Sequence, residues 1–445
     1  MDGHAKPAAR RPPRTVARRP VVAVVLVVAL AIAATGCWPA PGQGPDRSSY
    51  NPFETVITPA TVGSLAPVWT ATIEPDMTGG VVGPPVVSNA GVHVSDGTAV
   101  HSFDLATGTR LWMVPDSPVI NGAIGDPIAD GNRVMVTTGF PVGFGGAWNT
   151  NTNWHDARTG AYQENVPTSR VTGRRGSWVA SYSAQGGPVV GLYLFGLQVR
   201  DLADPGSGWG IMARFGTAPA FAPPATLGRE RLYYAGPATV AFDPLTNVTG
   251  VRAFSLQTPP PTCVPPPEGL PIGGLSCPLW ATPTDGAPVT SPVLAADESV
   301  VYVTTSTGTL LAFDAADGQV RWSAPLGATA SADPALAEGW IYVALDDGRL
   351  VALPAGGCGA ATCGVAWQAD VGGAGVQPAV AGGLVFVGTD AGHVVALPAA
   401  GCGKANCPVR WRHDFGAPIT GAPAVTNGRL YIGVSPNQVV ALAPD

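Results

Sequence analysis

The sequence is poor in charged residues and shows no amphipathic helical pattern after its first 36 residues. Asp, Glu, Lys and Arg make up only 12% of the 445 residues, whereas 46% are hydrophobic. This balance argues against a disordered chain. The 58 glycines and 46 prolines fall between short runs of β-forming residues, where an all-β fold needs its turns. We therefore expect a folded, all-β protein.

Catalytic and metal-binding motifs are also missing. The chain contains no G-x-S-x-G, Walker or H-E-x-x-H pattern. Asp346–Gly348 and Thr389–Gly392 are typical of hairpin turns rather than calcium loops. None of the six histidines falls at ligand spacing with a carboxylate pair: His4, His93, His101, His155, His393 and His413. The residues alone thus predict no catalytic residue and no metal site.

Residues 1–36 have the pattern of an export signal. Six Lys and Arg residues precede an apolar run from Val21 to Ala34, which is too short for a comfortable membrane span. The run ends in Ala34-Thr35-Gly36-Cys37, which resembles the lipobox of bacterial lipoproteins. That resemblance implies cleavage before Cys37 and a lipid on this cysteine; the alternative is an ordinary secretory signal. Residues 37–59 are interpreted as a flexible tether.

An excess of basic residues is lacking once the signal is removed. The remaining chain holds 18 basic and 29 acidic residues, a net charge of about −11. This charge disfavours nucleic acid and provides no polybasic patch for anionic lipid. We expect a monomer anchored through Cys37, at the outer face of the plasma membrane or the periplasmic side of an outer membrane.

The other six cysteines fall into three local pairs: Cys263 with Cys277, Cys358 with Cys363, and Cys402 with Cys407. The last two pairs share a C-x4-C spacing at the same place in successive repeats. We interpret all three as disulfides of an exported protein. The alternative is a zinc site, since four thiolates at paired spacing suit that metal.

A repeated pattern organises most of the chain. Residues 301–322 contain two alternating strand patterns around a turn at Gly308, and a third run that ends at Trp322. Similar stretches begin at Ile341, Val385 and Leu430, about 45 residues apart, which indicates a repeat architecture.

Two markers count the repeats. A proline opens the first strand of each unit: Pro85, Pro127, Pro188, Pro224, Pro292, Pro334, Pro378 and Pro423. A tryptophan closes the last strand of most units: Trp112, Trp209, Trp280, Trp322, Trp367 and Trp411. The second unit has Glu164 where the first has Trp112. The last unit ends without its final strand, and the orphan strand around Trp69 is predicted to complete it.

The intact repeat reads G-x-x-x-A-x-D-x-x-x-G-x-x-x-W, with Gly308, Ala312, Asp314, Gly318 and Trp322 at the named positions. It resembles the docking motif of the pyrroloquinoline-quinone-type (PQQ-like) β-propellers, although Pro354 and Pro398 replace the Asp in later copies. The resemblance extends over residues 60–445 and implies an all-β propeller of eight four-stranded blades, with seven as the alternative. It also implies that the tryptophans at 69, 112, 209, 280, 322, 367 and 411 dock neighbouring blades.

The same resemblance leaves two functions open. One is a non-catalytic scaffold without a cofactor, similar to the lipoprotein propeller of the outer-membrane β-barrel assembly machinery, which binds an envelope protein or glycan. The other is a dehydrogenase that uses PQQ and calcium on an alcohol or sugar. The adjacent-cysteine pair common in those enzymes is missing here.

One region departs from the repeat. Aromatic, arginine and amide side chains gather between residues 139 and 180, a mixture that suits a binding site for a sugar or a peptide. Its candidate residues are Trp148, Trp154, His155, Arg174, Arg175 and Trp178. The alternative is that the tryptophans cover a wide blade and the arginines are solvated.

Overall fold

The computed structural model describes residues 37–73, 82–115, 125–142, 147–166, 170–185, 193–204, 208–215, 225–237, 249–256 and 278–445. Residues 1–35 and 36–445 form separate units, and the second unit is described below. Its described residues contain 33 strands and one short 3-10 helix, η1 (Val62–Ser64). Short β-forming runs punctuated by glycine turns account for this composition.

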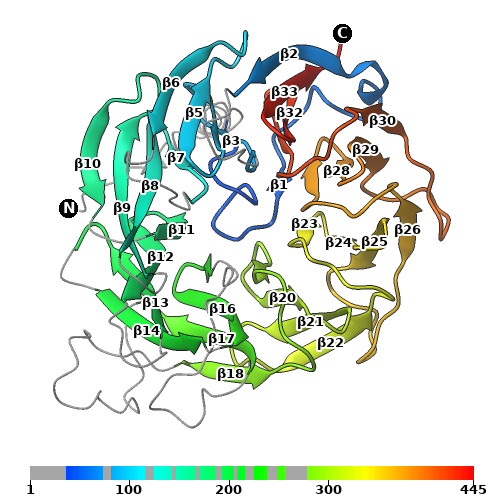
Figure 1. Ribbon diagram of the computed structural model, residues 1–445. Coiled ribbons are helices and arrows are strands. Elements are labelled where there is room, and N and C mark those ends of the chain that lie inside the picture. The colour runs from blue at the N-terminus through cyan, green and yellow to red at the C-terminus, as the bar shows by residue number, and fades with distance from the viewer. Residues whose placement is uncertain are drawn as a thin grey trace, which may run out of the picture. The chain divides into compact units, whose positions relative to one another are not determined.

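The strands form eight sheets, each with four main strands, arranged in a ring (Figure 1). Blade 1 contains β3 (Val86–Val87), β4 (Val92–Ser95), β5 (Ala99–Phe103) and β6 (Arg110–Pro115). Blade 2 contains β7 (Ile128–Asp130), β8 (Arg133–Val142), β9 (Ala147–Asp156) and β10 (Tyr162–Val166). Blade 3 contains β11 (Arg170–Arg175), β12 (Trp178–Gln185), β13 (Tyr193–Asp201) and β14 (Gly208–Phe215). Blade 4 contains β15 (Thr226–Leu227), β16 (Arg231–Pro237), β17 (Thr249–Ser255) and β18 (Trp280–Pro283).

The second half repeats this plan, with shorter central strands than those of blades 2 and 3. Blade 5 contains β19 (Val293–Leu294), β20 (Val300–Thr304), β21 (Thr309–Asp314) and β22 (Val320–Pro325). Blade 6 contains β23 (Ala335–Ala337), β24 (Trp340–Ala344), β25 (Arg349–Pro354) and β26 (Trp367–Asp370). Blade 7 contains β27 (Ala379–Ala381), β28 (Leu384–Gly388), β29 (His393–Pro398) and β30 (Trp411–Asp414). Blade 8 contains β31 (Ala424–Thr426), β32 (Arg429–Val434), β33 (Gln438–Ala443) and β2 (Ala66–Thr72).

Blade 8 closes the ring with strands from both ends of the propeller. β2 pairs antiparallel with β33, and Trp69 stands opposite Ala441. Figure 1 shows this junction as a blue strand beside red ones. The pairing completes blade 8 and joins the two ends of the propeller within one sheet. The predictions of an all-β propeller, of eight blades and of closure by the strand around Trp69 are confirmed.

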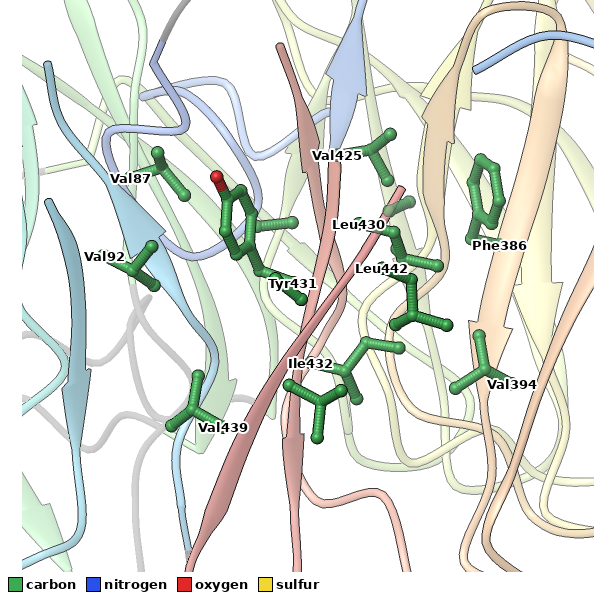
Figure 2. Close-up of a cluster of buried hydrophobic side chains, with 14 of the residues drawn as sticks. Val87, Val92, Phe386, Val394, Val425, Leu430, Tyr431, Ile432, Val439 and Leu442 are labelled. Atoms are coloured by element: carbon green, nitrogen blue, oxygen red, sulfur yellow. The ribbon is translucent and has the colours of Figure 1, made fainter. Parts of the chain in front are cut away.

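The hydrophobic core lies between the faces of neighbouring blades. Around blade 8 it joins side chains of three blades, with Leu430 and Ile432 of β32 between Val92 of β4 and Phe386 of β28 (Figure 2). All four side chains are buried. Each blade therefore buries both of its faces, which is why the central strands contain near-continuous apolar runs.

The N-terminal strap, residues 37–51, corrects the prediction of a flexible tether over residues 37–59. Its backbone bonds to the innermost strand of one blade after another, and Figure 1 shows the dark-blue segment inside the ring. Carbonyls of the strap accept N–H groups of blades 1, 2, 4, 5, 6 and 7 at 2.7–3.3 Å, from Val87, Ala129, Leu227, Leu294, Leu336 and Val380.

Two further contacts extend the strap around the ring. β1 (Tyr50–Asn51) adds to blade 7 as a fifth strand, parallel to β27, and the Asn51 amide donates to the Val425 carbonyl of blade 8 at 2.9 Å. Ala40 packs on the cluster shared by blades 2 and 3. The strap satisfies donors on the short inner strands that otherwise have no neighbouring strand. Its proline- and glycine-rich composition suggested flexibility. The prediction failed because backbone hydrogen bonds to the inner strands require no particular pattern of side chains.

Two of the three predicted disulfides are present. Cys358 bonds to Cys363 and Cys402 to Cys407, each with Cα atoms 5.6 Å apart. Each bridge closes the loop before the outer strand of its blade, within one blade, so the zinc alternative is wrong for these four cysteines. Cys263 and Cys277 lie outside the described residues.

Candidate functional site

Blades 1 and 2 are joined by a tryptophan that lies against a turn. Trp112 of β6 contacts Gly160 in the β9–β10 turn, and its indole N–H donates to the Ala157 carbonyl at 2.9 Å. Gly160 has a φ of +70°, and a Cβ atom there would lie 2.8 Å from the Trp112 ring. Both the conformation and the close approach require glycine. We call the space that such an indole fills the docking slot.

The docking slot recurs around the ring. Four more indoles lie against a turn glycine of the next blade: Trp69 on Gly108, Trp280 on Gly318, Trp322 on Gly357 and Trp367 on Gly401. Trp69 and Trp280 also donate to the carbonyls of Leu105 and Ala315, each at 3.1 Å. Trp411 packs partly buried on the core around blade 8. The side chain of Trp209 lies outside the described residues.

Blade 2 departs from the pattern that the other docking strands share. A small residue, alanine or serine, stands opposite six of the seven docking tryptophans on the neighbouring strand: Ala441, Ser102, Ala253, Ala312, Ala352 and Ala396. In blade 3, Val199 stands opposite Trp209. In blade 2 the docking position holds Glu164, and Trp154 of β9 stands opposite. Trp154 is 3% exposed and belongs to the cluster between blades 2 and 3. In blade 2 the large aromatic side chain is therefore on β9, one strand inward of the docking strand β10.

A pocket of about 450 Å³ remains where the docking indole is missing. It is lined from blade 2 by Arg133, Trp154, Glu164, Asn165 and Val166, and from blade 3 by Arg174, Gly176, Ser177, Leu202 and Ala203. Leu202 follows Asp201 at the end of β13, as Ala157 follows Asp156 at the end of β9. The pocket therefore lies beside Leu202 and Ala203, the first residues after β13; residues 205–207, farther along this connection, lie outside the described residues. Its volume falls in the range typical of ligand sites.

The floor of the pocket combines an aromatic face with two arginines. The guanidinium carbons of Arg133 and Arg174 lie 4.4 and 5.3 Å from the centroid of the Trp154 ring. Asp130 accepts ion pairs from both arginines, at 3.2 and 2.9 Å. Stacking on Trp154 and pairing with Asp130 fix the guanidinium planes. Glu164 adds an exposed carboxylate at the same site.

The structure brings together two of the six predicted ligand-binding residues, Trp154 and Arg174. Arg175 instead pairs with Glu298 at 2.8 Å and donates to the Leu227 carbonyl, which links blade 3 to the next two blades. Trp178 packs on the cluster between blades 3 and 4.

His155 is not among the residues that line the pocket. The His155 ring bonds the Gly160 carbonyl at 3.0 Å and meets Tyr162 edge-on. Trp148 lies on β9, and its side chain is outside the described residues. Sequence reasoning missed Arg133, although Glu164 in a tryptophan position was visible as a signal.

Blade 1 buries two histidines beside the first docking tryptophan. His93 stacks on Trp112 with ring centroids 5.5 Å apart and bonds the Ser88 hydroxyl at 2.8 Å. Burial lowers the pKa of His93 to about 3, so its ring is neutral at physiological pH.

The second histidine of blade 1 faces a carboxylate. His101 pairs with Asp96 at 2.9 Å. Burial by itself would raise the pKa of Asp96, but hydrogen bonds from His101, Ala99 and Thr98 outweigh burial and lower the pKa to about 2. Both groups belong to the fold of blade 1.

Among the described residues, no acidic cluster matches the calcium site that the sequence resemblance raised. In the described parts of the chain, no three His, Cys, Asp or Glu side chains are grouped to hold a metal ion. The acids near the strap are bound by the chain's own donors. Glu54 accepts the N–H groups of Val56, Ile57 and Gly428 at 2.8–3.0 Å, and Asp333 pairs with Arg47 at 3.1 Å. We derive no reaction step through that cofactor.

Comparison with known families bears on the second half of the chain. A family model described as outer membrane protein assembly factor BamB matches residues 277–357 and 356–445. These ranges hold the last strand of blade 4, blades 5 to 7 and the C-terminal strands of blade 8. Residues 277–445 are PQQ-like propeller repeats. Their turn glycines and docking tryptophans are those described above for blades 5 to 7.

Two solved structures share the whole fold. The quinohemoprotein alcohol dehydrogenase of Comamonas testosteroni is 15% identical with a TM-score of 0.61, and the alignment covers 94% of this chain and 82% of that one. BamB from Moraxella catarrhalis is 18% identical with a TM-score of 0.54, and the alignment covers 85% and 97%. At these identities the PQQ-like fold is shared, and function does not follow.

A closer match in sequence is short. Protein Rv3035 of Mycobacterium tuberculosis is 56% identical over 46 residues. The match spans 10% of this chain and 11% of that protein. No helix in the described residues is long and apolar enough to cross a membrane.

Proposed function

We propose that this chain is an exported, lipid-anchored PQQ-like propeller without a cofactor or catalysis, which binds a protein or glycan partner at the cell envelope. The observation that carries the proposal is the pocket between blades 2 and 3. It offers a fixed aromatic face, two held guanidinium groups and a carboxylate. Such groups recognise a partner by stacking and hydrogen bonding. The likeness to BamB in fold and in the C-terminal repeats supports a binding role.

The lipobox-like sequence before Cys37 supports the anchoring part of the proposal, and the position of Cys37 shows where the anchor would join the propeller. Its thiol lies 3.3 Å from the Asn89 side chain in the β3–β4 turn. Trp38, the next residue, is 1% exposed and pairs with Val87 of β3. A lipid on Cys37 is attached one residue before this pairing, beside the inner strand of blade 1. Because almost no linker separates the lipid from the propeller, the propeller lies close to the membrane surface.

Anchoring is tested by phase separation of the full chain expressed in a bacterium that processes lipoproteins. The wild type is expected in the detergent phase, with a mature N-terminal peptide heavier than its sequence by the mass of a lipid. Cys37→Ser moves the protein to the aqueous phase. An unlipidated N-terminus on the wild type would support the ordinary secretory signal instead.

Partner binding is tested by placing a photo-reactive amino acid at Ser177 in the pocket. The matched control carries it at Lys404, in the exposed Cys402–Cys407 loop of blade 7. A discrete cross-linked product from position 177 and none from 404 is expected. Equal products from both positions, or none from either, would contradict a binding site in this pocket.

A further inference from the structure

The strap leaves the ring through a loop that turns its charge inward and its apolar side chains outward. We call residues 52–60 the exit loop. Phe53 is 41% exposed and Val56 is 50% exposed, whereas Glu54, the one charged residue of the loop, is 6% exposed. Proteins usually expose the carboxylate and bury the apolar side chains. The exit loop therefore presents hydrophobic side chains to whatever lies outside the ring.

The fold holds the exit loop in this orientation. The Asn51 side chain accepts the Phe53 N–H group at 3.0 Å. The Glu54 carboxylate accepts the N–H groups of Val56 and Gly428 at 2.8 and 3.0 Å. A Cβ atom at Gly428 would lie 2.9 Å from the Val56 side chain, so the loop packs closely on this turn of blade 8. Charge-assisted hydrogen bonds thus fix the outward positions of Phe53 and Val56.

Exposed hydrophobic side chains gather around the exit loop. Among the described residues, eight large apolar side chains are exposed. Five belong to the exit loop or to the outer strands β2 and β6 of blades 8 and 1, and we call them the apolar sector: Phe53, Val56, Val68, Leu111 and Met113. The other three lie one each in or beside blades 2, 4 and 5: Tyr162, Leu279 and Val320. Single exposed apolar side chains are ordinary, whereas a group of them marks a contact surface.

Charge is distributed around the ring in the matching way. The turn between the first and second strands occupies the same end of every blade. In blades 7, 8 and 1 this turn contains no charged residue, at positions 382–383, 427–428 and 88–91. In blades 4, 5 and 6 it contains five: Arg229, Glu230, Asp297, Glu298 and Glu338. In blades 2 and 3 charged residues flank it: Asp130, Arg133 and Arg175.

One charged residue does stand beside the turn of blade 8. Arg429 follows Gly428, but its guanidinium group donates to the Leu105 carbonyl of blade 1. The sector of blades 7, 8 and 1 can therefore approach an apolar phase at this end of the ring without stripping water from charged turns.

The position of Cys37 indicates which surface covers the apolar sector. Its thiol lies 3.3 Å from the Asn89 side chain in the uncharged turn of blade 1, and the exit loop bonds the equivalent turn of blade 8. Blades 8 and 1 are neighbours in the ring (Figure 1). We propose that the apolar sector rests on the phospholipid bilayer that holds the lipid on Cys37, with Phe53 and Val56 in the interfacial region. This inference rests on the lipid anchoring in the proposed function, and it adds an orientation.

A bilayer is favoured over a protein as the occupant because the anchor leaves little room. Trp38 already pairs with Val87 of blade 1, so no linker separates a lipid on Cys37 from the ring. A protein domain seated on the exit loop would have to fit between the ring and the membrane. Blades 8 and 1 thus face the bilayer, and blades 4 and 5, with their charged turns, point away from it.

The test places a fluorescent amino acid at position 53 of the full chain, expressed in a bacterium that processes lipoproteins. The lipidated protein is reconstituted in phosphatidylcholine vesicles brominated near the headgroup end of the acyl chains. Emission from position 53 should be quenched at least about twofold relative to vesicles without bromine. The matched control carries the probe at Val320 of blade 5, which is 47% exposed and lies across the ring (Figure 1). Equal quenching at both positions, or none at position 53, would overturn the proposal.

A second measurement guards against a probe that disturbs the exit loop. The probe is placed at Met113 on β6, and its quenching is compared in the lipidated parent and in Phe53→Asp/Val56→Asp. Two carboxylates on the exit loop should reduce this quenching at least about twofold, because they resist entry into the bilayer. Val320→Asp should leave it unchanged. Quenching at Met113 that is the same in all three proteins would contradict the proposed orientation.

Mass analysis of the N-terminal peptide separates this inference from the anchoring on which it rests. If Cys37 carries a lipid and position 53 is quenched, both stand. If Cys37 carries a lipid and position 53 is not quenched, the orientation fails and the anchoring stands. If Cys37 carries no lipid, the anchoring fails and the orientation fails with it.

Discussion

The interface between blades 1 and 2 and the interface between blades 2 and 3 differ in the side chains that occupy the docking position and the position opposite it. At the first, Trp112 fills the docking slot and a small residue, Ser102, stands opposite. At the second, Glu164 stands in the docking position and Trp154 lies opposite. The first interface is sealed by its own indole, whereas the second keeps a pocket of about 450 Å³. One exchange across two strands thus separates a purely structural joint from a candidate binding site.

The largest expected loss of stability comes from removing the Trp112 side chain from the interface between blades 1 and 2. Trp112→Ala should lower the free energy of unfolding by about 3–5 kcal/mol, because the ring is buried and its N–H donates to Ala157. Glu164→Ala, at the matching position of the next blade, should change it by less than about 0.5 kcal/mol. Urea unfolding of both variants measures the difference. Similar losses of stability in the two variants would show that the docking positions of the two interfaces contribute equally to stability.

Acid is expected to lower the free energy of unfolding through His93, which stacks on Trp112 at the interface between blades 1 and 2. The folded-state pKa of His93, about 3, lies below that of the unfolded chain, so its stabilising contribution is complete above about pH 6.5 and is lost as the pH falls toward 3. By pH 4 the loss is about 3 kcal/mol. His93→Gln should flatten this part of the stability profile measured by urea unfolding between pH 4 and 7. A profile as steep as that of the wild type would exclude His93 as its source.

A smaller loss of stability is expected from a substitution in the turn that contacts Trp112. Gly160→Ala should cost about 1–3 kcal/mol, because it adds backbone strain at positive φ and a methyl group 2.8 Å from the ring. Gly131→Ala is the control, since its φ is also positive, at +59°, but no atom lies within 4 Å of the added Cβ. Thermal unfolding of the two variants separates contact from strain. Equal shifts in Tm would mean that the docking contact contributes nothing.

The fold followed from the sequence more fully than the candidate site did. Proline, glycine and tryptophan recur at fixed places in each repeat, so blade number and ring closure through Trp69 were readable from local chemistry. The strap was misread because backbone hydrogen bonds to inner strands depend on no particular side chain.

The site was readable only in part. Trp154 and Arg174 stood out as unusual side chains in the second and third units. Arg133 did not, because its place over Trp154 depends on the register of β8 with β9. Arg175 follows Arg174 directly in sequence, yet alternation along β11 directs it to Glu298 rather than into the pocket. The contacts between blades decide these roles, and no local pattern encodes them.

The most direct measurement is the yield of cross-linked product from a photo-reactive amino acid at Ser177, compared with the yield from the same amino acid at Lys404. If the pocket between blades 2 and 3 binds an envelope partner, position 177 gives a discrete product and position 404 gives none. Equal yields at the two positions, or no product from either, would show that no partner is bound at this pocket, and would contradict the account.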